Sequence, residues 1–237
     1  MRKSIAFTLI FIAFLILLCG CGKNRRESSQ SFDSSSISHI NIDAGDHPIV
    51  LEDTQGEEIT LSLSEDVKQI GTIEEQSLKI KLQPQSGIIN IKEPSKLVIG
   101  IPGKWNGSVD VTSKAGTAQA ENVSLLYLAF RSDSGNIILK NVSGDISAKT
   151  NSGKIEASSI TKSQLNIETD SGAVLLNNIS GTILAKTDSG RIQVPNNLAD
   201  QVKPGNMNLG EVLELQIDNT DTCTIKVYTN AGNIKID

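Results

Sequence analysis

Acidic and amide side chains recur in this sequence at a spacing that could place them side by side. Asp133, Asn151, Asp170 and Asp188 follow one another at steps of 18 or 19 residues, and Asn230 stands in the same context. If each begins the same turn of a repeating fold, carboxylates of neighbouring repeats face each other, and Ca²⁺ could bridge them together with backbone carbonyls. The aspartates among them, Asp133, Asp170 and Asp188, are weak candidates for a metal site.

The same residues also have a purely structural interpretation. Each is followed by a serine or alanine and then a glycine. An Asp or Asn side chain can hydrogen-bond the backbone of a tight turn, and glycine accepts a positive φ there. Calcium-binding β-rolls carry several glycines in each nine-residue unit, whereas each unit here carries one. This difference favours structural corners, and we predict neither a metal site nor a cofactor.

Other catalytic patterns are missing from the sequence. Both histidines, His39 and His47, precede the repeats, and His47 before Pro48 is typical of a surface turn. No nucleotide fingerprint, zinc spacing or nucleophile motif occurs. The single tryptophan, Trp105, could stack on a sugar ring or pack over an open end of the fold. We predict that the protein is not an enzyme, with a carbohydrate-active enzyme as the alternative.

Regularly spaced glycines mark the turns between the elements that would position Asp133, Asn151, Asp170 and Asp188. Successive glycines lie 18 or 19 residues apart, and a second series lies half a step away. The predicted turn glycines are Gly116, Gly135, Gly144, Gly153, Gly172, Gly181, Gly190 and Gly232. Apolar residues alternate with polar ones after these glycines, as in Ile155 and Ala157. A period of two over so few residues predicts short strands.

Two short strands and two turns make one flattened coil of 18 to 19 residues, and a fixed repeat of this length is typical of a solenoid. We therefore predict an all-β parallel β-helix; the alternative is an antiparallel β-sandwich of hairpins. Asn122, Asn141 and Asn178 recur at the same spacing, with Ser159 in the remaining slot. In a solenoid these residues stack. The residues that follow the asparagines fill one interior stripe: Val123, Val142 and Ile179.

The N-terminus has the pattern of an exported lipoprotein. Arg2 and Lys3 precede an apolar run from residue 5 to 18, too short for a comfortable membrane span. Gly20 and Cys21 then resemble a lipobox, in which the cysteine is acylated and becomes the new N-terminus. We predict a signal peptide over 1–20, lipidation of Cys21, a flexible Ser-rich tether over 21–36 and one β-solenoid domain over 37–237.

Charge and cysteine content agree with such a location. The chain carries 22 basic and 27 acidic residues, and loss of Arg2 and Lys3 leaves 20 − 27 = −7. A net negative chain argues against a nucleic-acid partner, because binding to phosphates requires a basic surface. Once Cys21 carries lipid and Cys19 leaves with the signal, Cys223 stands alone, so no intrachain disulfide is expected. In the segment TCTIKVY, Cys223 has the parity of a small core residue.

Several longer segments resemble a known bacterial family. The resemblance rests on the opening ISHINIDAGDHPIVLED, the stretch LVIGIPGKWNGSVDVTSKAGTAQAENV, the repeats that follow, and the closing TNAGNIKI. They resemble the "putative-adhesin" β-strand-repeat domain, a family of unknown function that includes LiaG-like envelope proteins. The resemblance implies a β-solenoid on the outer side of the cytoplasmic membrane. Residues 195–220 depart from the repeat, which leaves the register of the last coils open.

These observations define the expected function. We predict a membrane-tethered, extracytoplasmic lipoprotein that serves as a non-enzymatic binding or scaffold module of the cell envelope, in a setting of envelope stress that the resemblance implies. Its anchor partner is the lipid bilayer, through acylated Cys21. The expected ligands are an envelope polysaccharide or a membrane protein, because the outward strand positions mix charged residues with Ser, Thr and Asn. A signalling accessory to a membrane sensor is a further hypothesis.

Overall fold

A computed structural model describes residues 27–64, 70–82 and 95–194, together with three C-terminal strands, β16 (Val212–Ile217), β17 (Cys223–Thr229) and β18 (Asn233–Ile236). Strands make up almost all of the regular structure, and one short 3-10 helix, η1 (Ser34–Ser36), joins the first two strands. The described part of the chain contains no helix with the length and apolarity of a membrane span.

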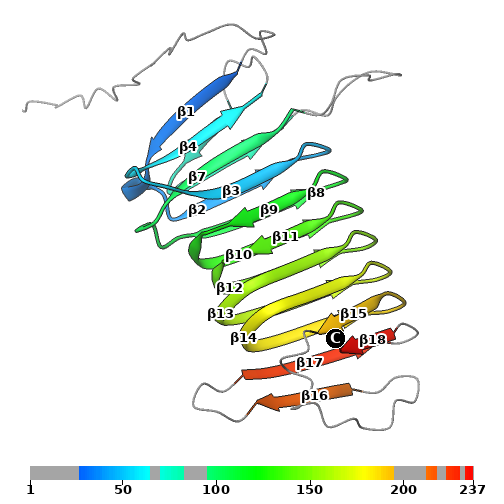
Figure 1. Cartoon of the computed structure of the whole chain (residues 1–237). Coiled ribbons are helices and arrows are strands. Elements are labelled where there is room, and N and C mark those ends of the chain that lie inside the picture. The colour runs from blue at the N-terminus through cyan, green and yellow to red at the C-terminus, as the bar shows by residue number, and fades with distance from the viewer. Residues whose placement is uncertain are drawn as a thin grey trace, which may run out of the picture.

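The strands form two faces of a flattened solenoid (Figure 1). On each face, neighbouring strands come mostly from successive coils. In spatial order, the first face consists of β5 (Gly71–Glu74), β6 (Ser77–Lys81), β2 (His39–Asp43), β8 (Ser108–Ser113), β10 (Ser124–Ser132), β12 (Ser143–Thr150), the second halves of β13 (Ile155–Thr169) and β14 (Val174–Thr187), β17 and β16. In the same order, the second face consists of β1 (Ser28–Asp33), β4 (Glu58–Leu63), β7 (Leu97–Pro102), β3 (Ile49–Thr54), β9 (Ala118–Glu121), β11 (Ile137–Lys140), the first halves of β13 and β14, β15 (Arg191–Val194) and β18.

The register confirms the parallel solenoid. Ile146 of β12 pairs with Leu165 of β13, and Leu165 pairs with Ile183 of β14, which are steps of 19 and 18 residues. Both pairings are parallel, so one coil advances the chain by one strand on each face. The alternative of an antiparallel sandwich is wrong, because its hairpins would pair neighbouring strands in opposite directions.

Antiparallel strands occur at the two ends of the stack. At the N-terminal end, β4 pairs antiparallel with β7 and with β1, and β5 pairs antiparallel with β6. At the C-terminal end, β16 pairs antiparallel with β17, and β17 pairs in parallel with β14. The segment that departs from the repeat therefore contributes an end strand, and the coil register resumes after it.

The N-terminal end corrects the expected tether. Residues 21–36 were expected to be a flexible tether, but their second half is folded: β1 pairs along its whole length with β4, and Phe32 packs against the core. The folded domain thus begins near residue 28 and not at Ile37. Serine-rich composition hid the strand because Gln30 and Phe32 alternate with small polar residues that face solvent.

Chain order and spatial order also differ at this end. The coil of β2 and β3 comes first in the sequence, yet it lies second in the stack, between the coil of β6 and β7 and the coil of β8 and β9. Inward residues of both faces form one continuous core, in which Phe130 is the largest fully buried side chain. Alanines such as Ala148, Ala157 and Ala185 alternate with isoleucines and leucines, as the thin interior requires.

Candidate functional site

On the first face, the corners that follow β10, β12, β13 and β14 are each held by a buried hydroxyl. The hydroxyl oxygen accepts a hydrogen bond from the backbone N–H of the glycine three residues later. The pairs, with donor–acceptor distances, are Gly135 to Ser132 (2.8 Å), Gly153 to Thr150 (3.1 Å), Gly172 to Thr169 (3.0 Å) and Gly190 to Thr187 (3.0 Å). The sequence carries a signal for this role, because every turn begins with Ser or Thr; the structure thus assigns to this hydroxyl a bond that the sequence pattern suggested for the Asp or Asn next to it.

The glycines of this column are required for a different reason from the one expected. Gly135, Gly153, Gly172 and Gly190 do not have positive φ. Each instead lies against the carbonyl of the corresponding glycine in the preceding coil. A Cβ added to Gly172 would lie 1.8 Å from the carbonyl oxygen of Gly153. Stacked backbone, and not left-handed geometry, excludes a side chain there.

The glycines of the half-step series do have positive φ. Gly144 has φ 118° and Gly181 has φ 117°, and a Cβ on Gly144 would also meet the carbonyl oxygen of Leu125 at 1.9 Å. Gly116 begins the column of corner glycines, because its Cβ would lie 2.2 Å from the carbonyl oxygen of His47. Gly232, Asn230 and Cys21 lie outside the described residues.

The opposite corner contains a ladder of residues in the left-handed region. Asn122, Asn141, Ser159 and Asn178 have φ between 48° and 56°. The amide of Asn141 donates to the Oδ1 of Asn122 at 2.8 Å, one coil away. The amide of Asn178 donates to the Ser159 hydroxyl at 3.3 Å. The residues after the asparagines are buried as predicted: Val123, Val142 and Ile179.

The acidic column lies at equivalent corners but forms no larger ligand cluster. The backbone N–H of Asp188 donates to the carbonyl of Asp170 at 3.2 Å, so these residues occupy adjacent coils. Asn151 separates Asp133 from Asp170 in the stack. Within residues 27–64, 70–82 and 95–194, no group of three or more His, Cys, Asp or Glu side chains is placed to hold a metal ion. Ca²⁺ prefers six to eight oxygen ligands, which two aspartates alone do not supply.

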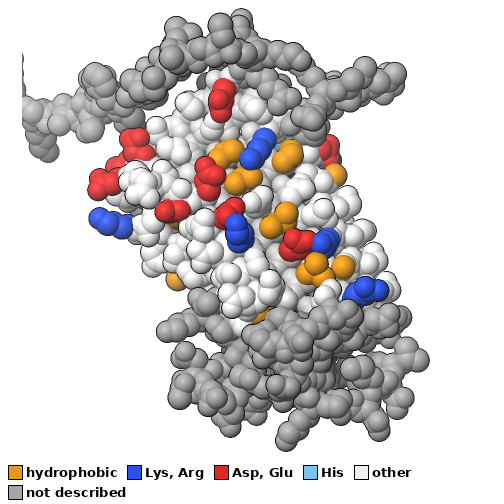
Figure 2. Space-filling view, viewed as in Figure 1, with side chains coloured by type: hydrophobic (Ala, Val, Ile, Leu, Met, Phe, Trp, Pro, Cys, Tyr) orange, Lys and Arg blue, Asp and Glu red, His pale blue; other side chains and the backbone are white. Residues whose placement is uncertain are grey.

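The outer faces carry charges paired from one coil to the next. Glu121 accepts from the Nζ of Lys140 at 2.6 Å, and Asp110 from the Nη1 of Arg131 at 2.9 Å. Glu168 lies between two lysines of neighbouring coils, 3.1 Å from Lys149 and 3.7 Å from Lys186. Figure 2 shows acidic and basic side chains interspersed with hydrophobic ones on one face.

These pairs shift protonation toward the charged forms. The hydrogen bond and charge of Lys140 lower the pKa of the Glu121 carboxyl. The hydrogen bond from Arg131 to Asp110 raises the pKa of the Arg131 guanidinium. A general acid of a glycosidase needs the opposite, a carboxyl whose pKa is raised. The face charges are thus arranged for mutual pairing.

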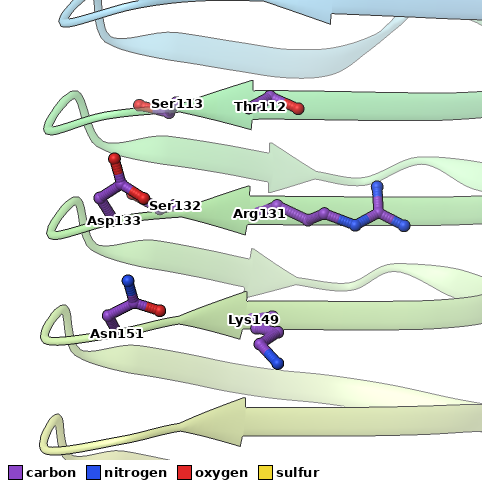
Figure 3. A pocket seen from close by; sticks show the side chains of 7 residues that line it. All are labelled: Thr112, Ser113, Arg131, Ser132, Asp133, Lys149 and Asn151. Carbon is purple, nitrogen blue, oxygen red and sulfur yellow. The ribbon is translucent and has the colours of Figure 1, made fainter.

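The first face carries a shallow hollow that could hold a ligand. It is lined by Thr112, Ser113, Arg131, Ser132, Asp133, Lys149 and Asn151, which come from three successive coils (Figure 3). Its volume is about 160 Å³, below the roughly 300 to 1,000 Å³ of typical small-molecule pockets. Such a hollow suits contact with the side of an extended partner better than enclosure of a substrate.

Two side chains that could have served a surface site, Trp105 and His47, are buried instead. Trp105 is 6% exposed, and its indole N–H donates to the carbonyl of Ile37 at 2.6 Å, so sugar stacking on this residue is wrong. His47 is 2% exposed, with its Nδ1 2.9 Å from the carbonyl oxygen of Ser95, and is not a surface residue. The Nε2 of His39 lies 3.6 Å from the Oδ2 of Asp110 on the first face.

Comparisons with known proteins give a family match and similar structures. A family model described as Toastrack DUF4097 matches residues 37–237. A structure of a "putative cell adhesion protein" from Clostridium sporogenes is similar, with 14% identity, 89% of this chain and 98% of that chain covered, and a TM-score of 0.50. Two structures described as "putative adhesin" also match, with coverage of about nine tenths of this chain and 97% of each of theirs: one from Parabacteroides distasonis (11% identity, TM-score 0.33) and one from Parabacteroides merdae (13%, 0.32). A search of curated proteins found no match.

Proposed function

Because the chain belongs to the Toastrack DUF4097 family, we propose that it is a non-enzymatic binding or scaffold module of the cell envelope, held at the outer side of the cytoplasmic membrane by lipid on Cys21. The family description and the adhesin names of similar structures support a binding role in a coarse sense. Membrane anchoring and a link to envelope stress are finer parts of the proposal, and they rest on the N-terminal sequence and on the family resemblance.

One observation carries the binding role: the outward side chains of each face stand in register from coil to coil. On the first face, Ser147 pairs with Asn166, which pairs with Leu184. On the second face, Lys140 pairs with Ser158, which pairs with Asn177. Parallel strands repeat about every 4.8 Å, so each face presents a row of mostly polar side chains at that interval. An envelope polysaccharide or a membrane protein segment can contact several coils at once.

The non-enzymatic part is supported by what the described side chains do. Carboxylates on the faces pair with lysines and arginines of neighbouring coils. The hollow on the first face is shallow and small. Paired carboxylates and a small hollow suit contact at the surface better than enclosure of a substrate.

The anchoring part is tested by Cys21→Ser. The wild-type chain should fractionate with membranes and incorporate a radiolabelled fatty acid, whereas Cys21→Ser should be released or remain as the unprocessed precursor. Cys223→Ser is the matched control and should behave as wild type. Processing and retention of Cys21→Ser like wild type would show that lipidation is not the anchor.

The binding role is tested by in-cell photocrosslinking from the two faces. A photoreactive residue replaces Asn166 on the first face or Asn177 on the second, both exposed and in adjacent strands. We expect one face to crosslink to an envelope polymer or membrane protein, and the other face serves as the control. New reducing ends after incubation of the protein with cell-wall polymers would instead support a carbohydrate-active enzyme.

A further inference from the structure

We infer that the solenoid stands on its N-terminal end at the lipid surface, with the β1 and β5 end nearest the bilayer and the β18 end farthest from it. This inference rests on the proposed membrane attachment near Cys21. Strand β1 begins at Ser28, seven residues after Cys21. At 3.3 to 3.6 Å per residue, the chain between them reaches at most about 25 Å. The anchor therefore holds the first strand close to the bilayer.

The strand next to the anchor is a fixed part of the solenoid. Gln30 of β1 accepts hydrogen bonds through its Oε1 from the backbone N–H of Ile70 at 2.8 Å and of Gly71 at 2.9 Å. Since Gly71 begins β5, this side chain joins the end strand of the second face to the end strand of the first. Phe32 packs against the core beside it. A pull on residue 28 is thus transmitted to the whole end of the stack.

The length of the stack sets how far the other end can lie from the membrane. Ten strands follow one another on the second face from β1 to β18. Nine steps of about 4.8 Å separate the first from the last, or about 43 Å. The last coils therefore lie beyond the reach of the spacer itself, and their distance from the lipid reports the orientation.

Neither face carries the charge that a flat orientation would need. Adsorption to lipid requires a basic or strongly apolar face. Within the described side chains, the charged outward positions of the first face are Lys79, Lys81, Arg131, Lys149 and Lys186 against Asp43, Glu74, Asp110, Asp145 and Glu168. Those of the second face are Lys140 and Arg191 against Asp33, Glu52, Glu58, Glu121 and Glu156. The first face is therefore balanced and the second is net acidic, so neither offers a basic surface to lipid.

Exposed apolar side chains also give no reason to lie flat. The large ones in the described part are Ile73, Leu126 and Leu184, at 44%, 57% and 38% exposure. Ile73 belongs to β5, the end strand of the first face, and Leu184 lies farther along the same face among polar neighbours. Single exposed apolar side chains of this kind are common on protein surfaces and do not form a membrane-binding patch. The short spacer at one end is thus the feature that orients the molecule.

The inference is tested with fluorescent labels at two heights on the same face. In the full chain with Cys223→Ser, Ser31→Cys labels β1 and Asn177→Cys labels β14, seven strands farther along. Both positions are exposed. In membranes from expressing cells, energy transfer to a lipid-bound acceptor should be several-fold stronger from position 31 than from position 177. Ser29→Cys, on the same strand, replaces Ser31→Cys if that variant does not fold.

Each outcome decides a separate claim. Equal transfer from both positions, or stronger transfer from position 177, in a membrane-bound chain would overturn the end-on orientation and leave the proposed function intact. Release of the chain into the soluble fraction would overturn the anchor and the orientation together. Insertion of about twenty Gly and Ser residues after Arg26 provides the control, since a spacer with a root-mean-square reach of about 25 Å should reduce the difference between the labels.

Discussion

Replacement of a corner glycine distinguishes two reasons for glycine at that position: crowding by the backbone of the preceding coil, or a left-handed backbone conformation. In Gly172→Ala, the new Cβ would lie 1.8 Å from the carbonyl oxygen of Gly153 and 2.7 Å from the hydroxyl of Thr169. An ordinary carbon–oxygen contact needs about 3.3 Å, so the corner must open by about 1.5 Å. That movement weakens the hydrogen bond from Ser171 N–H to the carbonyl of Asn151, now 3.0 Å.

The expected cost follows from these contacts. Overpacking in a rigid environment costs about 1 to 3 kcal/mol, and one or two lost hydrogen bonds add about 1 kcal/mol each. We therefore expect Gly172→Ala to lower the free energy of unfolding by about 2 to 5 kcal/mol. If a left-handed backbone were the reason for glycine, the cost would be about 1 kcal/mol, and asparagine would be tolerated better than alanine.

Two other glycines serve as matched controls. Gly45 has φ 55° and open space around its Cβ position, so only the backbone argument applies: alanine should cost about 1 kcal/mol, and asparagine less. Gly56 has no atom closer than 3.8 Å to its Cβ position and no positive φ, so alanine should be neutral or slightly stabilising.

The assay is chemical denaturation of the purified protein, followed by circular dichroism, with alanine and asparagine at all three glycines. Crowding predicts that Gly172→Asn is at least as damaging as Gly172→Ala. The stacked-backbone explanation would be refuted if the alanine and asparagine variants of Gly172 lost as little unfolding free energy as those of Gly45, with asparagine again the better tolerated.

Three further predictions concern the corners and faces. Thr169→Val should cost about 1 to 3 kcal/mol, because a buried glycine N–H loses its acceptor, and Thr169→Ser should retain most of the stability in the same denaturation assay. Asn141→Ala should destabilise by about 1 to 2 kcal/mol because of its left-handed φ; Asn141→Gly should recover most of this, and an equal loss in both would contradict the backbone argument. Lys140→Ala should raise the pKa of the Glu121 carboxyl toward its ordinary value, measured by NMR titration. Since the folded-state pKa of Glu121 is lowered, its contribution to stability is present above the unfolded-state pKa and is lost as pH falls through the folded-state value, so Lys140→Ala should flatten that acid dependence.

The repeat could be predicted from the sequence because every coil requires the same residue types at equivalent positions. A residue stacked on its own equivalent must fit the same space in each coil, and this kept the Ser or Thr, the glycine and the asparagine at fixed spacing. Apolar alternation at Ile155 and Ala157 then gave the inward positions, which the structure confirms as buried. Local chemistry and global fold agree here, so the sequence alone predicts the repeating coils.

The N-terminal end could not be read in the same way. Its strands pair across long separations, as β2 does with β8, and they carry no repeated corner. The burial of His47 and Trp105 depends on contacts with Ser95 and Ile37, 48 and 68 residues away in the chain. No local pattern encodes such contacts. The role of the corner glycines was missed for a related reason, since φ is a local property but the obstructing carbonyl belongs to the preceding coil.

The same stacking that fixes the corners determines where a partner can bind. Interior positions are filled by packed side chains, and corner positions are closed by backbone, so variation is tolerated only on the outward strand positions. Among these, several charged residues already pair with neighbouring coils, and a partner that used them would have to break those pairs. The middle row of the first face is different: Ser147, Asn166 and Leu184 lie in register on three coils, beside the charged row of Lys149, Glu168 and Lys186. Uncharged donors and acceptors beside one apolar group can contact a sugar polymer or a peptide without disrupting an ion pair, so this row is where we expect the partner of the first face to lie.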